Sequence, residues 1–328
     1  MENNLNNPKQ TSERTIADDE IDLRELFSVI WQGKWVVIAI TTLFAAASVF
    51  YAINQPNIYK SEALLAPAEE QQGGGLGALA GQFGGLASLA GVNLGGGNAS
   101  NKSQLAIEIL KSRQFTSQFI KKHNLLPNLM AVKSWDLATD SLIYNIEDYN
   151  SDTNTWLRQV KAPKNPEPSM QEAYKVFSSI LTISEDKESG MITLAVEHQS
   201  PVIAKQWVNW LIQDINEVMK SRDVAEANKS TEFLTKQLNQ TKIADIRTVL
   251  YKLIEEQTKT IMFANVRDEY VFKTIDPALV PEEKFKPKRA LICLLGTLLG
   301  CVLSVMIILV KHYTRVNKNS NISWKSSC

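Results

Sequence analysis

Hydrophobic residues gather in two long uncharged stretches near the ends of the chain. The first, 35–53, reads WVVIAITTLFAAASVFYAI, and the second, 290–310, reads ALICLLGTLLGCVLSVMIILV. At about 1.5 Å per residue, a helix of either length crosses a hydrocarbon core of about 30 Å. The pattern therefore predicts two transmembrane helices, with residues 54–289 forming a large domain between them.

The middle region begins and ends with strand-like sequence. Residues 58–65 read IYKSEALL and stop at Pro67, while the turn sequence EDKESG, which ends in Gly190, separates two further runs. Such runs around a glycine-containing turn predict a β-hairpin. The strands expected are 58–65, 181–184, 191–197 and 270–275.

A long helical region follows the predicted hairpin. Ser200 followed by Pro201 is typical of a helix start, and the apolar period then runs through 201–267 with a polar break near 222–228. The arm after that break, about 38 residues long, would extend roughly 57 Å. Its apolar stripe needs a partner, either within the domain or in another subunit.

Two further regions complete the expected fold. Residues 103–123 have a helical period, and residues 127–170, which contain several prolines, favour loops and short helices. The fold class is therefore α+β: two transmembrane helices flank a large α/β domain with a long extended helix.

A glycine-rich tract, 73–97, interrupts the start of the domain. It contains 11 glycines and no charge. We do not expect a third span, because glycine is a poor helix former and an odd number of spans would separate the termini. The tract is interpreted as a flexible loop, although its regularly placed leucines also favour a surface that packs against a neighbour or lipid.

The short terminal segments decide the expected orientation. The tail 311–328 has basic residues and no acidic one, and the start of the chain lacks the apolar core of a signal peptide. Residues 23–30 instead form an amphipathic stripe before the first span. Basic residues favour the cytoplasmic side, whereas long loops cross regardless of charge. We therefore expect 1–34 and 311–328 in the cytoplasm.

Small residues line one face of the second predicted span. Gly296, Gly300 and Ser304 recur every four residues, a spacing that lets two helix backbones approach closely in lipid. The alternative is that glycine is simply common in membrane helices. Before this span, three prolines predict a stiff connection: Pro277, Pro281 and Pro287.

No constellation of catalytic or ligand-binding residues is found. The sequence has no phosphate-binding loop and no HExxH motif, and its three histidines are isolated. We therefore expect no cofactor, no metal and no enzymatic activity. Equal numbers of basic and acidic residues, 35 each, argue against nucleic-acid binding. The domain contains no cysteine, so no internal disulfide is available to it.

Three segments resemble a known family. EIDLRELFSVIWQGKWVVIAI and NIYKSEALLAP at the first span, and TKTIMFANVRDEYVFKTIDPALVPEEKFKPKRA before the second, are similar to the polysaccharide chain-length determinants, the Wzz family of polysaccharide co-polymerases. By position, Pro277, Pro281, Pro287, Gly296 and Gly300 match the family's proline-rich segment and second span. The glycine-rich tract is longer than in enterobacterial members.

The resemblance implies a location and an architecture. The protein would lie in the bacterial inner membrane with its main domain in the periplasm. An α/β base near the membrane would carry a long helix, and identical subunits would close into a ring. The implied role is control of O-antigen chain length together with the polymerase that extends undecaprenyl-linked repeat units.

Two alternatives remain open. One is an adaptor for a separate cytoplasmic tyrosine kinase in capsule or exopolysaccharide export. Only 18 residues follow Val310, so no fused kinase is expected. The other is a two-span sensor with an external ligand domain.

Overall fold

A computed structural model describes residues 29, 31–68 and 98–325. These form two units, one from 29–55 with 288–325 and the other from 56–287. Each unit is considered separately below. The predicted amphipathic stripe 23–30, apart from residue 29, and the glycine-rich tract 73–97 lie outside the described residues.

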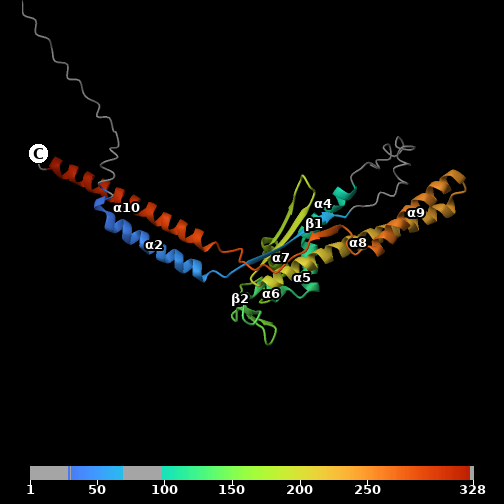
Figure 1. Cartoon of the computed structure of the whole chain (residues 1–328), viewed down its shortest axis with the longest axis horizontal. Helices are drawn as coiled ribbons and strands as arrows, with labels where there is room; N and C mark the ends of the chain where they lie inside the picture. Colours follow the sequence, from blue (N-terminus) through green and yellow to red (C-terminus); the bar gives the residue numbers. More distant parts are fainter. Residues whose placement is uncertain (1–28, 30, 69–97, 326–328) are drawn as a thin grey trace, which may run out of the picture. The chain divides into compact units, whose positions relative to one another are not determined.

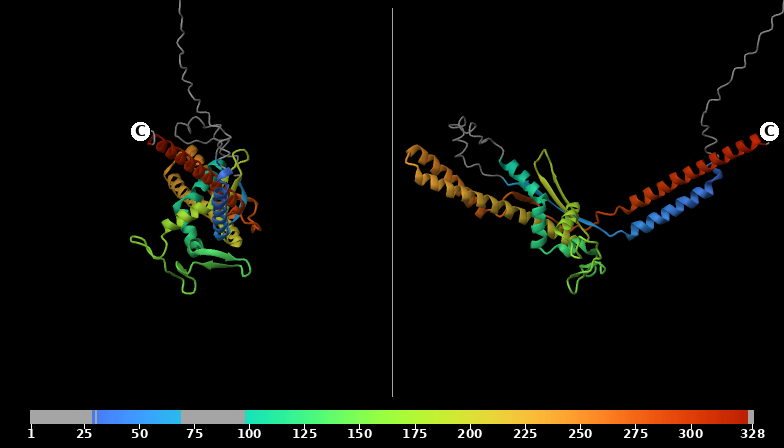
Figure 2. Two further views of the ribbon diagram at one scale, coloured as in Figure 1. Left: turned by 90° about the vertical axis from the view of Figure 1, so that its left-hand side faces the viewer. Right: turned by 180° about the vertical axis from the view of Figure 1, so that it is seen from behind.

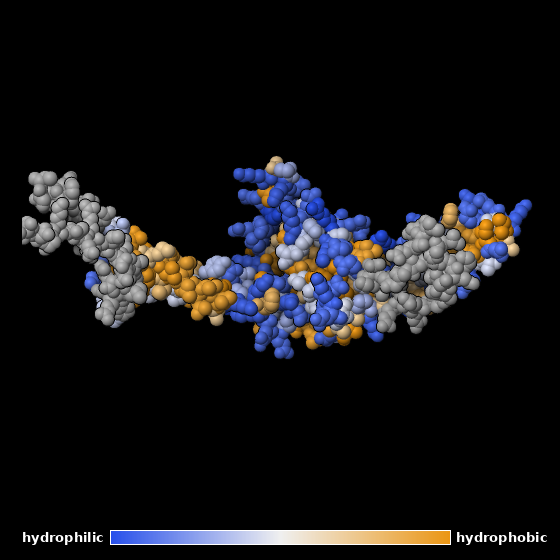
Figure 3. Space-filling view, turned by 90° about the horizontal axis from the view of Figure 1, so that it is seen from above, coloured by the Kyte–Doolittle hydropathy of each residue, from blue (hydrophilic) through white to orange (hydrophobic). Residues whose placement is uncertain are grey.

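The first unit is a pair of antiparallel helices, α2 (Lys34–Asn54) and α10 (Arg289–Lys325). Figures 1 and 2 show the two helices side by side along the length of α2. Both are long and apolar enough to cross a membrane, and hydrophobic side chains dominate their outer surface (Figure 3). Helix α10 includes the predicted second span and continues beyond it.

The second unit is built on a four-stranded antiparallel sheet with the order β6-β7-β1-β8. Its strands are β1 (Tyr59–Pro67), β6 (Leu181–Glu185), β7 (Ile192–His198) and β8 (Phe272–Asp276). All four predicted strands and the β6-β7 hairpin are confirmed. Gly190, in the turn of that hairpin, has a positive φ of 68°, which glycine adopts without steric cost.

One face of this sheet forms the hydrophobic core. Ala63 lies opposite Leu194, and Leu65 lies opposite Ile192, so these four buried side chains point to the same side. Helices α4 (Asn98–Lys111), α7 (Met170–Ile180) and α8 (Pro201–Gln240) cover it. Helices α5 (Arg113–Lys122) and α6 (Leu126–Met130) pack against α7.

The predicted helix 103–123 is divided into α4 and α5 at Ser112. The Ser112 side chain accepts a hydrogen bond from the backbone N–H of Phe115 and so caps the start of α5. This new start turns the chain, and Phe115 and Phe119 become buried in the core. The apolar period continues across Ser112, which is why the sequence pattern did not show the break.

The region predicted as loops and short helices, 127–170, contains two small hairpins. They are formed by β2 (Val132–Asp136) with β3 (Ser141–Tyr144) and by β4 (Tyr149–Asn150) with β5 (Thr155–Trp156). The prediction missed these strands because they are short. Contacts between the rings of Tyr144, Tyr149 and Trp156 join the two hairpins.

The long helical region is a helical hairpin, and the predicted break near 222–228 is wrong. Helix α8 is continuous through this polar stretch, which lies mostly on the surface. The chain turns instead at Thr241–Ile243, and α9 (Ala244–Val266) returns along α8 (Figures 1 and 2). Arg247 stabilises the turn by donating hydrogen bonds to the carbonyls of Leu238 and Thr241.

Candidate functional site

The glycines of the second predicted span lie against α2. A Cβ atom added to Gly296 would lie 2.5 Å from the Cβ of Ser48. One added to Gly300 would lie 2.6 Å from the Cβ of Phe44. Real Cβ atoms do not approach so closely, so the helix spacing at both positions requires glycine. That this contact matters for assembly remains a prediction.

Further contacts extend along the same pair of helices. Ser304 is fully buried, and its hydroxyl donates to the backbone carbonyl of Cys301. Near the start of α2, a Cβ on Gly33 would lie 2.5 Å from Ile308. At the other end, the Arg289 side chain donates to the carbonyl of Ala52. Gly33 was not recognised in the sequence, because it lies outside the uncharged stretch and has no small partner at helical spacing.

The three predicted prolines lie in the segment between β8 and α10. Pro277 follows β8 directly and is exposed, whereas Pro281 and Pro287 are half-buried. The segment is attached to β1, because the Leu279 carbonyl accepts a hydrogen bond from the Ser61 hydroxyl at 2.7 Å. The backbone of Lys286 also pairs with Ile58, next to the start of β1. The connection is therefore held to the sheet at two points.

A buried asparagine links α8 to β8. The Oδ1 of Asn216 accepts from the backbone N–H groups of Val271 (2.7 Å) and Phe272 (3.0 Å). Its Nδ2 donates to the Phe272 carbonyl at 3.1 Å. Val271, Phe272 and Asn216 are all buried, so these bonds replace contacts with water that the backbone has lost. No sequence pattern indicated a role for Asn216, which interrupts an otherwise apolar face.

A buried carboxylate joins α8 to α5. Asp214 accepts from Lys122 Nζ at 2.6 Å and contacts His123 Nε2 at 2.9 Å. The His123 ring stacks on Trp210, with centroids 4.2 Å apart and planes 12° apart. The Asp214 carboxylate therefore has its partners within this cluster, and these contacts fix the position of α5 against α8. Within the described part of the chain, no group of three His, Cys, Asp or Glu residues could hold a metal ion.

His198, the last residue of β7, is buried and held by two backbone groups. Its Nδ1 accepts from the Ser200 N–H at 3.0 Å, so the proton is on Nε2, which donates to the Asn128 carbonyl at 3.0 Å. The Trp207 ring lies beside it, with centroids 5.0 Å apart. Burial lowers the pKa of His198 below its ordinary value of 6.5, because the charged form loses its hydration.

We therefore expect His198 to make the domain less stable in mild acid. The unfolded chain takes up a proton near the ordinary pKa, whereas the folded chain resists it. The stabilising effect is complete above pH 6.5 and is lost as the pH falls from 6.5 towards the lowered pKa. Urea unfolding of the full chain in detergent, between about pH 8 and about pH 5, measures this loss. In His198→Gln the loss should be smaller, and an identical pH dependence in both proteins would rule the histidine out.

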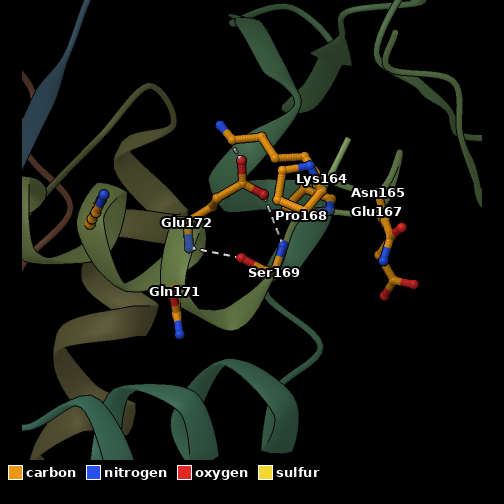
Figure 4. A pocket seen from close by; sticks show the side chains of 9 residues that line it. Lys164, Asn165, Glu167, Pro168, Ser169, Gln171 and Glu172 are labelled. Carbon is orange, nitrogen blue, oxygen red and sulfur yellow. Dashed lines mark hydrogen bonds and ion pairs between the residues drawn. The ribbon is translucent and has the colours of Figure 1, made fainter. Parts of the chain in front are cut away.

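A surface hollow lies beside the start of α7 (Figure 4). Ser169 and Glu172 form a capping box there, each side chain bonding the backbone N–H of the other. The pKa of Glu172 is lowered to about 2. The hydrogen bond from the Lys164 ammonium group is the largest cause, and the hydrogen bond from the Ser169 N–H is the next. The Glu172 carboxylate caps the helix and forms ion pairs with Lys164 and Arg158, so its role is to stabilise the local fold.

The α8–α9 hairpin leaves hydrophobic side chains uncovered. Ala227 and Ala264 are buried between the two helices, so α9 covers part of the predicted apolar stripe. Hydrophobic surface remains visible at the far end of the hairpin (Figure 3). Exposed side chains on the turn and on α9 include Ile243, Ile246, Val249, Met262 and Val266. Helix α9 thus covers part of the predicted apolar stripe within the domain, and further hydrophobic side chains of the hairpin are exposed.

Two family models match the chain. The chain length determinant protein model, Wzz, matches residues 19–123, which include α2, β1 and α4. The GNVR model, described as "G-rich domain on putative tyrosine kinase", matches residues 234–313, which include α9, β8 and much of α10.

Among curated proteins, the tyrosine-protein kinase etk of Escherichia coli strain K12 is 22% identical over 72% of this chain and 38% of the kinase. The etk proteins of strains O127:H6 and O157:H7 give the same values. The chain therefore spans less than half the length of the curated relatives that it matches.

Two solved structures are also similar in part. A full-length bacterial polysaccharide co-polymerase aligns with a TM-score of 0.37 and 14% identity, over 90% of this chain and 98% of that one. A fragment of WzzB, the polysaccharide co-polymerase of Salmonella Typhimurium, aligns with a TM-score of 0.29 and 11% identity, over 70% and 100%. Both scores are too low to establish a shared fold by themselves.

The similarity to the Wzz family rests on the sequence models and agrees with the architecture. The Wzz model covers the first membrane helix and the first strand of the domain. The structure then has a mixed helix–strand domain, a long helical hairpin and a second membrane helix. Over residues 19–123 the chain is therefore similar to the chain length determinant proteins, the Wzz family.

Proposed function

We propose that this protein regulates the chain length of the O-antigen of lipopolysaccharide, without catalysing a reaction itself. The observation that carries the proposal is the Wzz match across the first membrane helix and the start of the domain. Similarity to this family supports a role in regulating polysaccharide length in general. The proposal adds the O-antigen as the polymer and its polymerase, which extends undecaprenyl-linked units, as the partner.

The proposed topology has both termini in the cytoplasm and the domain in the periplasm. Two membrane helices place the termini on one side, and the basic tail 311–328 favours the cytoplasm for that side. The domain 56–287 would then meet the growing polymer, which is extended outside the cytoplasm.

The proposed working form is a ring of identical subunits. The hydrophobic side chains left exposed on α9 and at its turn support it, because apolar patches of this kind mark protein interfaces. We propose that the close contacts of Gly296 and Gly300, together with buried Ser304, keep the two membrane helices paired in each subunit. The segment that contains Pro277, Pro281 and Pro287 would then join each domain to its second helix.

Deletion of the gene in its own host tests the function. Lipopolysaccharide from the deletion strain, separated on a silver-stained gel, should lose its modal band and keep short chains of random length. Complementation with the full chain should restore the band. An unchanged ladder would contradict a role in O-antigen length.

A second candidate function is supported by the GNVR match at 234–313 and by the similarity to etk. In this version the protein is an adaptor that works with a separate cytoplasmic tyrosine kinase in export of a capsule or exopolysaccharide. The deletion strain should then keep its lipopolysaccharide ladder but release less exported polysaccharide. Tyrosine phosphorylation of the partner kinase should fall in the same strain.

A further inference from the structure

One side of the α8–α9 hairpin carries an apolar patch near the turn. We call it the tip patch, and its exposed side chains are Phe233, Ile246, Val249 and Leu253. Counting about 100° per residue, Phe233 is rotated about 120° from the buried Ala227, and Val249 about 60° from the buried Ala264, in the same sense. In two antiparallel helices, the same sense of rotation leads to the same side of the pair. The patch is therefore shared by both helices.

The tip patch lies on the side of α8 that faces the core in the first half of the helix. Ile215 is fully buried, and this half of α8 packs against β1 and β7. Phe233 follows Ile215 after 18 residues, or five complete turns, so both side chains point to the same side. Ile215 is covered by the sheet, whereas Phe233 is 60% exposed.

The two ends of the glycine-rich region meet α8 at one place. The Ala68 N–H, at the end of β1, donates to the carbonyl of Val271 at 2.9 Å. The hydroxyl of the neighbouring Tyr270 donates to the Asp223 carboxylate of α8 at 2.7 Å. Lys102 of α4 pairs with the same carboxylate at 2.9 Å. The chain between Ala68 and α4 thus leaves and returns beside the hairpin.

This connecting chain, residues 69–97, is long enough to reach the tip patch. Phe233 is ten residues beyond Asp223, which is about 15 Å along the axis of α8. Half of the 29 connecting residues would cover about 46 Å at about 3.3 Å per residue. The chain can therefore extend to the patch and back without being fully stretched.

The composition of these residues suits an apolar partner. The tract 73–97 has no charge, and its glycines and alanines separate five large apolar side chains: Leu76, Leu79, Phe83, Leu86 and Leu89. Burial of apolar surface contributes about 25 cal/mol per Å². Contact with the tip patch would remove apolar surface of both partners from water at once.

We propose that residues 73–97 cover the tip patch of the same chain. A segment tethered beside its binding surface is present there at an effective concentration of the order of millimolar, whereas a second copy must first associate. Met262 and Val266 lie on the side of α9 that faces away from α8, so they stay free for contacts between subunits. The inference requires neither the polymer nor the polymerase, and so it does not depend on the proposed function.

Cross-linking of the full-length protein in nanodiscs tests the proposal. The background variant has serine in place of the three cysteines, Cys293, Cys301 and Cys328. Phe83→Cys, at the middle of 69–97, is combined with Val249→Cys and treated with a short bismaleimide. The matched control combines Phe83→Cys with Met262→Cys, which is exposed but faces away from α8. Oligomers assembled from isotopically labelled and unlabelled chains distinguish links within a chain from links between chains by mass spectrometry.

The pair 83–249 should cross-link with about five times the yield of the pair 83–262, and within single chains, because the tether favours its own patch. Links that mainly join labelled to unlabelled chains would overturn the inference, since a second copy would then supply the cover. Equal yields at 249 and 262 would also overturn it, because the connecting chain would then have no preferred partner on the hairpin.

Thiol protection provides a second measurement. Val249→Cys alone, in the same background, is modified by a polar maleimide. Replacement of the five large apolar residues of the tract by serine should raise the modification rate at 249 about fivefold and leave that of Met262→Cys unchanged. A rate at 249 that is the same with and without these replacements would contradict the proposal. Both measurements are independent of the lipopolysaccharide ladder, which tests the proposed function separately.

Discussion

The substitution Gly300→Leu is expected to separate α2 from α10 and to broaden the distribution of polysaccharide lengths. A Cβ at position 300 would lie 2.6 Å from the Cβ of Phe44 and 3.4 Å from the Cα of Thr41. Both atoms are part of, or directly bonded to, the backbone of α2, so a side-chain rotation cannot relieve the clash. Overpacking of this kind costs about 1–3 kcal/mol in a close-packed interior. Silver-stained lipopolysaccharide gels and the size of the purified oligomer measure the effect.

Cys301→Leu provides the matched control for this substitution. Cys301 is the next residue of α10, but its side chain is exposed, so added bulk meets no neighbour within the chain. It should leave both the ladder and the oligomer size unchanged. If Gly300→Leu behaves in the same way, the contact between the two membrane helices has no part in assembly or length control.

Asn216→Ala is expected to destabilise the domain by about 3 kcal/mol, because it leaves two buried backbone N–H groups without an acceptor. Those groups belong to Val271 and Phe272 at the start of β8. Strand β8 is an edge strand that pairs only with β1 within the sheet, so α8 supplies a substantial part of its anchorage. Urea unfolding of the full chain in detergent gives the change in free energy of unfolding.

Asn209→Ala removes the same amide from the same helix at an exposed position. Its effect should stay within about 0.5 kcal/mol, as for most surface substitutions. Similar losses in the two variants would mean that the Asn216 hydrogen bonds contribute little, and that the cost comes from shortening a side chain on α8.

Much of the secondary structure could be predicted from local patterns. The strand-like run 58–65, the turn at Gly190 and the capping sequence Ser200-Pro201 each correspond to an element of the structure. These signals act over a few residues, through backbone geometry and the satisfaction of nearby N–H groups. Two uncharged stretches likewise predicted the two long apolar helices, because length and composition alone decide whether a helix can span a bilayer.

The partner of each element was decided by the tertiary structure. The polar stretch 222–228 looked like a break, but it lies mostly on the surface of a continuous helix, and the turn comes at 241–243. Periodicity shows which face of a helix is apolar, not which segment covers it, so the return of α9 along α8 could not be predicted.

The same limit applies to individual residues. Asn216 is buried because it bonds backbone groups 55 and 56 residues away, and Gly300 meets Phe44 across the pair of membrane helices. Local sequence patterns were enough to predict the two long apolar helices, most of the strands and the start of the long helix. What those elements contact could not be predicted in this way, since contacts between distant residues depend on where the whole chain folds back.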